Sequence, residues 1–162
     1  MPGLSADDLH RFLAEPGHLL RLGTTGTDGL PRVVPIWFAH DDGRLWFTPR
    51  ARSAWLADLH ADPGVCCTID ESAPPMRKLV ARGRAVLEHD LGDDDRWRDR
   101  YRTIAVRYLP EAYADAYLAD THDEPRALWS LDLATAEIAT WRMPVAGEDP
   151  LAVWASRYYH RT

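Results

Sequence analysis

One stretch of the chain combines residue types that could bind an aromatic ligand carrying an anionic group. A proline-containing run, RVVPIWF, is followed by a turn, by the run RLWFT, and then by RARSA at the start of a predicted helix. A helix N-terminus offers unpaired amide donors and a positive potential. Arg50, Arg52 and Ser53 add two cations and a hydroxyl there. The pattern therefore predicts a site for an anion such as a phosphate.

The run over residues 30–39 adds a second feature, because Pro31 and Pro35 lack the amide donor that a central strand needs. We therefore expect an edge strand, or a strand with a bulge. Unpaired backbone groups beside Trp and Phe side chains suit a flat heteroaromatic ring whose nitrogens and oxygens need hydrogen-bond partners. A phosphate joined to a planar ring describes a flavin. Core packing is the competing interpretation for these aromatic residues.

Other catalytic chemistries lack a matching motif. The seven histidines form no HxxxH or HExxH pair, so no metal site is expected. Cys66 and Cys67 are adjacent in a predicted strand, which points them to opposite faces, and both are interpreted as small core residues. No serine lies in a GxSxG elbow, and neither a GxxxxGK loop nor a GxGxxG motif occurs. No catalytic side chain is therefore assigned.

Hydrophobic periodicity and turn signals predict the elements that position these residues. Helices are expected from Ser5 to about Pro16, within 53–64, and as two consecutive helices across 93–120. Strands are expected over 18–25, 30–39, 44–49, 64–70 and 76–90, followed by a strand pair over 127–143 with a turn near Ala134-Thr135. Hairpins without βαβ alternation favour an α+β fold, a small barrel with helices on its outside.

The length of 162 residues fits a single domain. This domain, 1–162, is divided into an N-terminal helix (1–16), the barrel, a helical insertion (93–120) and a C-terminal tail (144–162). The net charge of -6 disfavours nucleic acid as a partner. The N-terminal residues do not form a signal peptide, and no apolar run is long enough to span a bilayer. We therefore expect a cytoplasmic protein with no membrane partner.

The order of these blocks resembles the flavin-binding split barrels of the pyridoxamine 5'-phosphate oxidase-like superfamily, and more closely their flavin/deazaflavin oxidoreductase branch. The similarity runs from about His18 to Trp141, through LGTTGTDGLPRVVPIWFAHDDGRLWFTPRARSAWLADLHADPGVCCTIDE, RKLVARGRAVLE and the strand pair ending in IATW. The resemblance implies a six-stranded antiparallel split β-barrel and a homodimer with two cofactor sites at the subunit interface. It also implies an oxidoreductase that uses FMN or coenzyme F420 and acts on a small-molecule substrate.

The resemblance further implies which segments hold the cofactor. A strand lines the ring through its backbone, the next strand contacts the ring or ribityl chain, the following helix start holds the phosphate, and a neighbouring strand approaches the ring. In this order, the implied cofactor-binding residues are Arg32, Val33, Val34, Pro35, Ile36 and Trp37; Phe47, Thr48 and Pro49; Arg50, Arg52, Ser53, Ala54 and Trp55; and Arg77 and Lys78.

One segment departs from the family pattern. Relatives often carry Ser-Arg-Lys or Thr-Arg-Lys where this chain has Ser53-Ala54-Trp55. Either Arg50 and Arg52, helped by Lys78, supply the same charge from displaced positions, or ordinary phosphate binding is lost and the cavity holds another ligand such as haem, which some split-barrel relatives bind. The second interpretation allows a different class of protein, a non-catalytic flavin or haem carrier or sensor.

Overall fold

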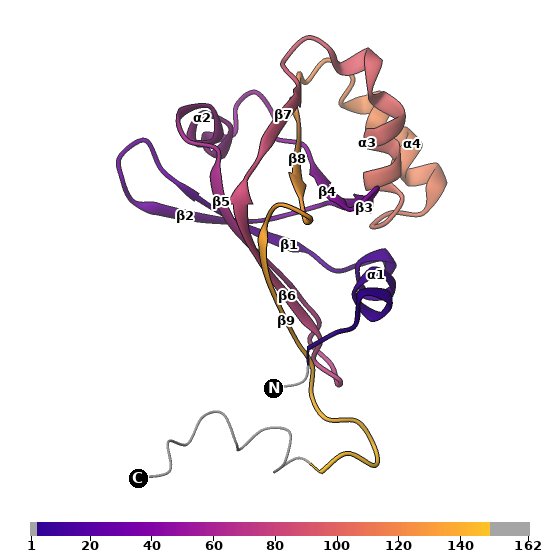
Figure 1. Ribbon diagram of the computed structural model, residues 1–162. Helices are drawn as coiled ribbons and strands as arrows, with labels where there is room; N and C mark the ends of the chain where they lie inside the picture. Colours follow the sequence, from indigo (N-terminus) through magenta and orange to yellow (C-terminus); the bar gives the residue numbers. More distant parts are fainter. Residues whose placement is uncertain (1–2, 150–162) are drawn as a thin grey trace.

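Two antiparallel sheets form the body of the molecule (Figure 1). The structure is a computed structural model, and it describes residues 3–149. One sheet has five strands in the order β2-β1-β5-β6-β9, and the other has four in the order β3-β4-β8-β7. The strands are β1 (Leu20–Thr25), β2 (Pro31–Ile36), β3 (Ala39–Asp41), β4 (Arg44–Phe47), β5 (Gly64–Asp70), β6 (Lys78–Arg84), β7 (Val86–His89), β8 (Leu128–Asp132) and β9 (Glu137–Trp141).

The helices lie on the outside of these sheets (Figure 1). They are α1 (Ala6–Ala14), α2 (Ala54–Ala61), α3 (Arg98–Ala105) and α4 (Glu111–Asp120), with a short 3-10 turn at Asp94–Arg96 before α3. Ser5 caps α1, as predicted, because its hydroxyl accepts a hydrogen bond of 3.1 Å from the backbone N–H of Asp8. The α+β class and the positions of all four predicted helices are therefore confirmed.

The predicted number of six strands is not confirmed, since the two sheets contain five and four strands. The sequence pattern itself predicts seven strands, and the structure has two more because two runs are divided where the chain passes from one sheet to the other. The run over 30–39 contains β2 and the first residue of β3, and the run over 76–90 contains β6 and β7. In the second run the apolar alternation of the sequence, with Leu79, Ala81, Ala85 and Leu87, continues across the division, so the sequence does not mark it.

β2 lies at the edge of the five-stranded sheet, where its two prolines predict it. It pairs with β1 alone, in unbroken register from Thr25 opposite Pro31 to Leu20 opposite Ile36. The edge placement is therefore confirmed, and the alternative of a bulge is not needed for this pair. The opposite edge of β2 is free of sheet partners among the described residues.

The hairpin between β3 and β4 connects the two segments, at the end of β2 and at the end of β4, that contribute to the candidate site. Asp42 and Gly43 connect the strands with positive φ angles of 50° and 70°. Two positive φ values in a two-residue loop characterise a type I′ turn, for which Asp-Gly is a preferred pair. This local preference fixes the register in which Ala39 lies opposite Trp46.

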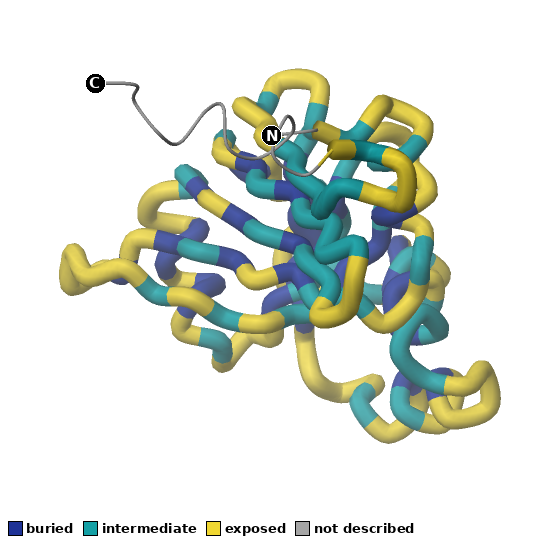
Figure 2. Tube along the Cα trace, turned by 90° about the horizontal axis from the view of Figure 1, so that it is seen from below, coloured by how far each residue is buried: buried dark blue, intermediate teal, exposed yellow. Residues whose placement is uncertain are grey.

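Two hydrophobic clusters form the interior, and buried positions concentrate where the strands cross (Figure 2). The larger cluster lies between the sheets and includes Phe12 of α1 and Trp55 of α2. The smaller one joins Trp97, Tyr101 and Leu118 of the helical insertion to the four-stranded sheet. The interpretation of both cysteines as core residues was half wrong, because Cys67 is buried whereas Cys66 is exposed on the opposite face of β5.

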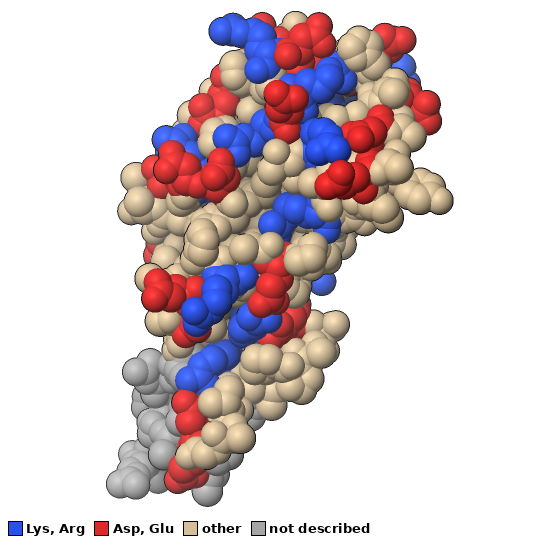
Figure 3. Space-filling view, turned by 90° about the vertical axis from the view of Figure 1, so that its right-hand side faces the viewer, with Lys and Arg blue, Asp and Glu red and all other residues tan. Residues whose placement is uncertain are grey.

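The surface over α1, α3 and α4 interleaves positive and negative side chains (Figure 3). No helix within residues 3–149 is both long and apolar enough to cross a bilayer. The predicted C-terminal tail begins after β9, and its aromatic run beyond residue 149 lies outside the described residues.

Candidate functional site

A cavity of about 200 Å³ lies between the barrel and the helical insertion. One side is formed by the ends of β2 and β4 and by the start of α2. The other side is formed by α3, α4 and Arg126, which lies just before β8. Its lining residues are Ile36, Trp37, Thr48, Arg50, Ser53, Trp55, Tyr101, Ile104, Tyr117 and Arg126. The set contains large aromatic rings and two arginines, but no carboxylate.

The aromatic side chains of the cavity are held by contacts with one another and with neighbouring rings. Trp37 stacks on Tyr108 with 5.0 Å between ring centroids and an angle of 4° between ring planes. Tyr117 meets Trp37 edge-on at 5.6 Å. The Trp55 ring is 9% exposed and packs against Phe47, with a centroid distance of 6.2 Å. These contacts hold the rings in place and leave their remaining surfaces to the cavity.

The two arginines of the cavity differ in their partners. Arg50 donates a hydrogen bond of 2.8 Å to the Tyr117 hydroxyl and forms an ion pair of 3.0 Å with Glu124. Arg126 is only 6% exposed and also donates to the Tyr117 hydroxyl, at 3.1 Å. Its guanidinium carbon lies 4.4 Å from the centroid of the Tyr101 ring. The charge of Arg50 is therefore partly neutralised, whereas Arg126 has aromatic and hydroxyl neighbours.

The phenol of Tyr117 responds to both arginines. Burial acts to raise its pKa, but hydrogen bonding and the positive charges of Arg126 and Arg50 outweigh this effect and lower the pKa below its usual value. The buried Nε of Arg126, at the cavity, has no hydrogen-bond partner among residues 3–149. The site is electropositive and retains unused donor capacity.

Six of the sixteen residues implied by the family resemblance come together at this cavity. They are Ile36, Trp37, Thr48, Arg50, Ser53 and Trp55. Ser53 is the N-cap residue of α2, as predicted, but its hydroxyl makes no capping hydrogen bond. Arg52 is exposed and lines a separate cavity of about 320 Å³, which Arg50 also borders.

Other implied residues lie elsewhere. Arg32 and Val33 line an open groove of about 660 Å³ on the five-stranded sheet. Arg32 Nε donates a hydrogen bond of 2.7 Å to the buried carboxylate of Asp58. Although burial acts to raise the pKa of Asp58, this bond and one from Thr24 hold it below its usual value. Of the remaining implied residues of β2, β4 and α2, Phe47 and Pro49 are buried, Val34 is half-buried, and Pro35 and Ala54 are exposed.

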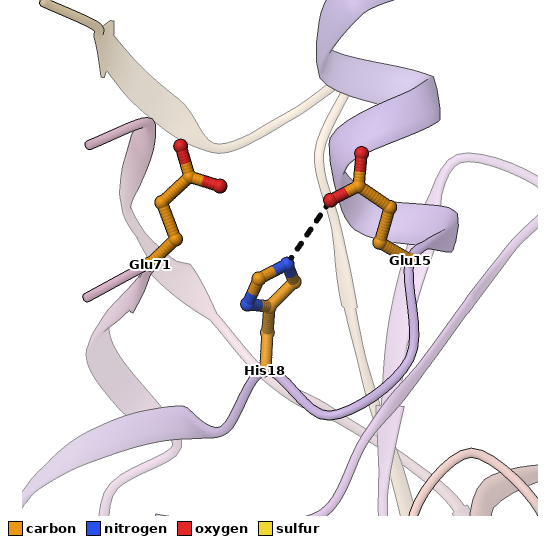
Figure 4. A group of neighbouring side chains, drawn as sticks. All are labelled: Glu15, His18 and Glu71. Atoms are coloured by element: carbon orange, nitrogen blue, oxygen red, sulfur yellow. Dashed lines mark hydrogen bonds and ion pairs between the residues drawn. The ribbon is translucent and has the colours of Figure 1, made fainter. Parts of the chain in front are cut away.

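Arg77 belongs to an ionic cluster whose residues do not line the cavity. Its guanidinium donates hydrogen bonds of 2.6 to 3.0 Å to both carboxylates of the pair Glu15 and Glu71. Figure 4 shows these two carboxylates with His18, whose Nε2 lies 3.3 Å from Glu15. Lys78, the neighbouring residue, places its ammonium over the Trp141 ring at 5.1 Å.

The cluster of Glu15, His18 and Glu71 has ligand atoms within 4.8 Å of one another, a spacing that a metal ion could use. The Arg77 guanidinium already supplies the positive charge that these carboxylates need. Hydrogen bonds from Arg77 lower the pKa of both Glu15 and Glu71. The cluster is therefore a complete ionic network that ties α1 to the sheet, and its geometry gives no reason to add a metal.

Sequence reasoning missed four lining residues: Tyr101, Ile104, Tyr117 and Arg126. The helical spacing of Trp97, Tyr101 and Ile104 in the sequence places them on a common face, but it does not indicate what that face covers. Arg126 carries no local signal, because its position depends on the isolated bridge between its backbone and that of Arg50. Only the pairing of distant segments brings these two arginines together.

The two antiparallel sheets and the external helices define an α+β fold of the split-barrel kind, with an aromatic cavity that contains two arginines. The chain belongs to the family described as pyridoxamine 5'-phosphate oxidase, whose model matches residues 6–141. Its fold and family membership thus confirm the resemblance to the split-barrel superfamily. No curated protein matches the sequence.

Solved structures with the same fold have different described ligands. An FAD-binding protein from Mesorhizobium loti is 21% identical, with a TM-score of 0.61 and coverage of 86% of this chain and 95% of that one. An F420 reductase is 26% identical, with a TM-score of 0.58 and coverage of 78% and 93%. The haem storage protein HutZ from Vibrio cholerae is 17% identical, with a TM-score of 0.61 and coverage of 85% and 94%.

Proposed function

We propose that this protein is an oxidoreductase that transfers hydride between FMN or coenzyme F420 and a small organic substrate. The observation that carries the proposal is the cavity in which Trp37 and Trp55 stand beside Arg50 and Arg126, with no carboxylate in the lining. Aromatic walls suit a planar ring, and cations suit an anionic tail. The similarity to an F420 reductase and to an FAD-binding protein supports the same class of ligand.

The residues present fit the anionic part of such a cofactor. Within the described part of the chain, Arg126 Nε has no hydrogen-bond partner, and the Ser53 hydroxyl makes no capping hydrogen bond. The cavity of about 200 Å³ is smaller than pockets for whole cofactors, which usually exceed roughly 300 Å³. A bound cofactor therefore extends past this cavity, along the free edge of β2 or into the neighbouring space that Arg50 and Arg52 border.

The chain's contribution under this proposal is binding and orientation. The flavin or deazaflavin ring supplies the hydride chemistry when bound, so no side chain is required as a nucleophile. Trp37 and Trp55 position the ring system and exclude water from it, and Arg50, Ser53 and Arg126 hold its charged tail. We further propose a homodimer in which a second copy covers the part of the cofactor outside the cavity; light scattering of the purified protein measures its mass.

The absorption spectrum of the purified protein tests the cofactor directly. Bands at about 450 nm indicate flavin and at about 420 nm deazaflavin, since these positions belong to the chromophores themselves. Colourless protein is titrated with FMN and with F420. A protein that binds neither FMN nor F420 contradicts the proposal.

Two arginine variants test where the cofactor lies. Arg50→Ala removes a charge-assisted contact and is expected to weaken FMN or F420 binding by about tenfold or more. Arg11→Ala is the control, because Arg11 lies on α1 with its side chain 69% exposed and lines neither this cavity nor the neighbouring space. Equal effects of the two substitutions would contradict the placement of the cofactor tail beside Arg50.

A non-catalytic flavin or haem carrier is the second candidate, and the presence of Trp55 in place of the usual cation favours it. The lining residues include two tyrosines but no His, Cys or Met, which limits the axial ligands available to haem iron in this cavity. A sharp Soret band after haem titration supports the carrier. With flavin bound, the reduced protein is mixed with quinones and nitroaromatic acceptors. If the bound reduced flavin is oxidised by these acceptors no faster than free reduced flavin, the result also supports the carrier.

A further inference from the structure

Arg126 is a buried cation without a carboxylate partner. No Asp or Glu among residues 3–149 lies within ion-pair distance of its guanidinium. The carboxylate of Asp94 accepts a hydrogen bond of 2.8 Å from the backbone N–H of Arg126 instead. Buried arginines are ordinarily paired, because removing a charge from water is costly unless an opposite charge replaces the solvent.

The neighbours of Arg126 leave part of its guanidinium unused. One nitrogen donates to the Tyr117 hydroxyl at 3.1 Å, and another reaches the Thr48 hydroxyl at the long distance of 3.5 Å. The third, Nε, has no hydrogen-bond partner among the residues that the structure describes. The Tyr101 ring covers one face. These contacts orient the guanidinium at the cavity, but they leave its positive charge uncompensated.

The other charges around the cavity do not provide compensation. Arg50 is also positive, and Glu124 is engaged by Arg50 at 3.0 Å and lines the neighbouring space rather than this cavity. The cavity therefore lacks one negative charge. The rings of Trp37 and Trp55 beside the arginines favour an aromatic body for the ligand that brings it.

We propose that Arg126, with the Tyr117 hydroxyl beside it, binds a carboxylate or phosphate group of an aromatic ligand in this cavity. A carboxylate is a planar oxyanion and a phosphate a tetrahedral one, and both accept paired hydrogen bonds from a guanidinium. The oxyanion belongs either to the substrate, as a carboxylate, or to the cofactor, as its phosphate. The place of this contact in a reaction rests on the proposed function, whereas oxyanion binding itself does not require a redox activity.

The test compares ligand pairs that differ in charge. The probes are benzoate against benzamide and FMN against riboflavin, titrated into the wild-type protein while tryptophan fluorescence is recorded. Arg126→Met, Arg126→Lys and the exposed control Arg11→Met are titrated in the same way. Arg11 lies on α1 with its side chain 69% exposed, so it controls for the loss of one surface charge.

The wild-type protein is expected to bind the charged member of at least one pair about tenfold or more tighter than the neutral member. Arg126→Met abolishes this preference, Arg126→Lys retains part of it, and Arg11→Met leaves it unchanged. A structural role for Arg126 would instead weaken charged and neutral probes equally. If Arg126→Met does not fold, the Arg126→Lys titration decides the question.

The two probe pairs distinguish a substrate carboxylate from the cofactor phosphate. They also distinguish failure of this inference from failure of the proposed function. Preference for benzoate assigns the site to a substrate carboxylate, and preference for FMN over riboflavin assigns it to the cofactor phosphate. Benzoate binding that depends on Arg126 in a protein that binds no flavin upholds the inference while the proposed function fails. A wild-type protein without charge preference in either pair, or a preference that survives in Arg126→Met, overturns the inference.

Discussion

Arg77 and Arg126 are both largely withdrawn from solvent, yet their surroundings are opposite. The Arg77 side chain is 20% exposed and hydrogen-bonds to the carboxylates of Glu15 and Glu71. Arg126 is 6% exposed, and its guanidinium contacts two hydroxyls and the Tyr101 ring but forms no ion pair with a carboxylate among residues 3–149. One guanidinium completes a structural network, and the other leaves a positive charge at a cavity.

This difference separates a cation that stabilises the fold from one that is available to a ligand. Residue type alone does not make the distinction, because the family resemblance implied a cofactor role for Arg77 and none for Arg126. The decisive feature is whether a carboxylate already satisfies the charge. Substitutions that add or remove one charge in either region therefore test this distinction.

Trp55→Lys is expected to have the largest effect, because it adds a third cation to the electropositive cavity. The Trp55 ring is 9% exposed and belongs to the main core. Losing the ring and burying an ammonium should lower the free energy of unfolding by about 4 kcal/mol, measured by urea denaturation. Trp55→Phe, which keeps an aromatic ring, should cost much less. A stable Trp55→Lys protein that binds FMN more tightly would instead indicate that the cavity can accept the cation usual in the family at this position.

Arg77→Met tests the compensated region. It leaves the carboxylates of Glu15 and Glu71 without their cation, and Glu71 is only 11% exposed. We expect the free energy of unfolding to fall by about 3 kcal/mol, with no change in FMN or benzoate affinity. Arg82→Met is the matched control, since both partners of the Arg82–Glu137 pair are well exposed, and it should cost less than about 1 kcal/mol. Weaker ligand binding in Arg77→Met alone would return Arg77 to the cofactor site.

The same cluster should make stability depend on acidity. Hydrogen bonds from Arg77 lower the pKa of Glu15 and Glu71 in the folded protein below the ordinary value of 4.5. A carboxyl whose folded pKa is depressed contributes stability that is fully present above its unfolded pKa and is lost as the pH falls through the folded pKa. Urea denaturation below pH 4.5 should therefore show a steeper loss for wild type than for Arg77→Met. Parallel profiles would exclude this linkage.

Local sequence patterns predicted much of the frame that holds these two regions. Pro31 and Pro35 placed β2 at a sheet edge, and Asp42-Gly43 specified the β3–β4 turn. These predictions rest on backbone rules that act within a few residues. The breaks between β2 and β3 and between β6 and β7 were missed, because the corner between sheets is set by packing across the barrel.

The candidate site was predictable only in part, for the same physical reason. Trp37, Arg50 and Ser53 are close in sequence to the strand and helix ends that carry them, and they do line one cavity. Arg126 is 76 residues beyond Arg50, and only the bridge between their backbones brings the two together. The neutralisation of Arg77 likewise depends on Glu15, a contact across 62 positions.

Arg126→Met should have the smallest effect on the free energy of unfolding. The sign of this change distinguishes a structural arginine from one that binds a ligand. The substitution removes a buried charge without freeing a carboxylate, and it replaces the side chain with an apolar one of similar length. Loss of the contacts with Tyr101 and Tyr117 opposes this gain. The unliganded variant should therefore range from equally stable to about 1 kcal/mol more stable than wild type in urea. A loss of more than about 2 kcal/mol would place Arg126 in the same structural class as Arg77, because an arginine reserved for a ligand should not stabilise the empty cavity.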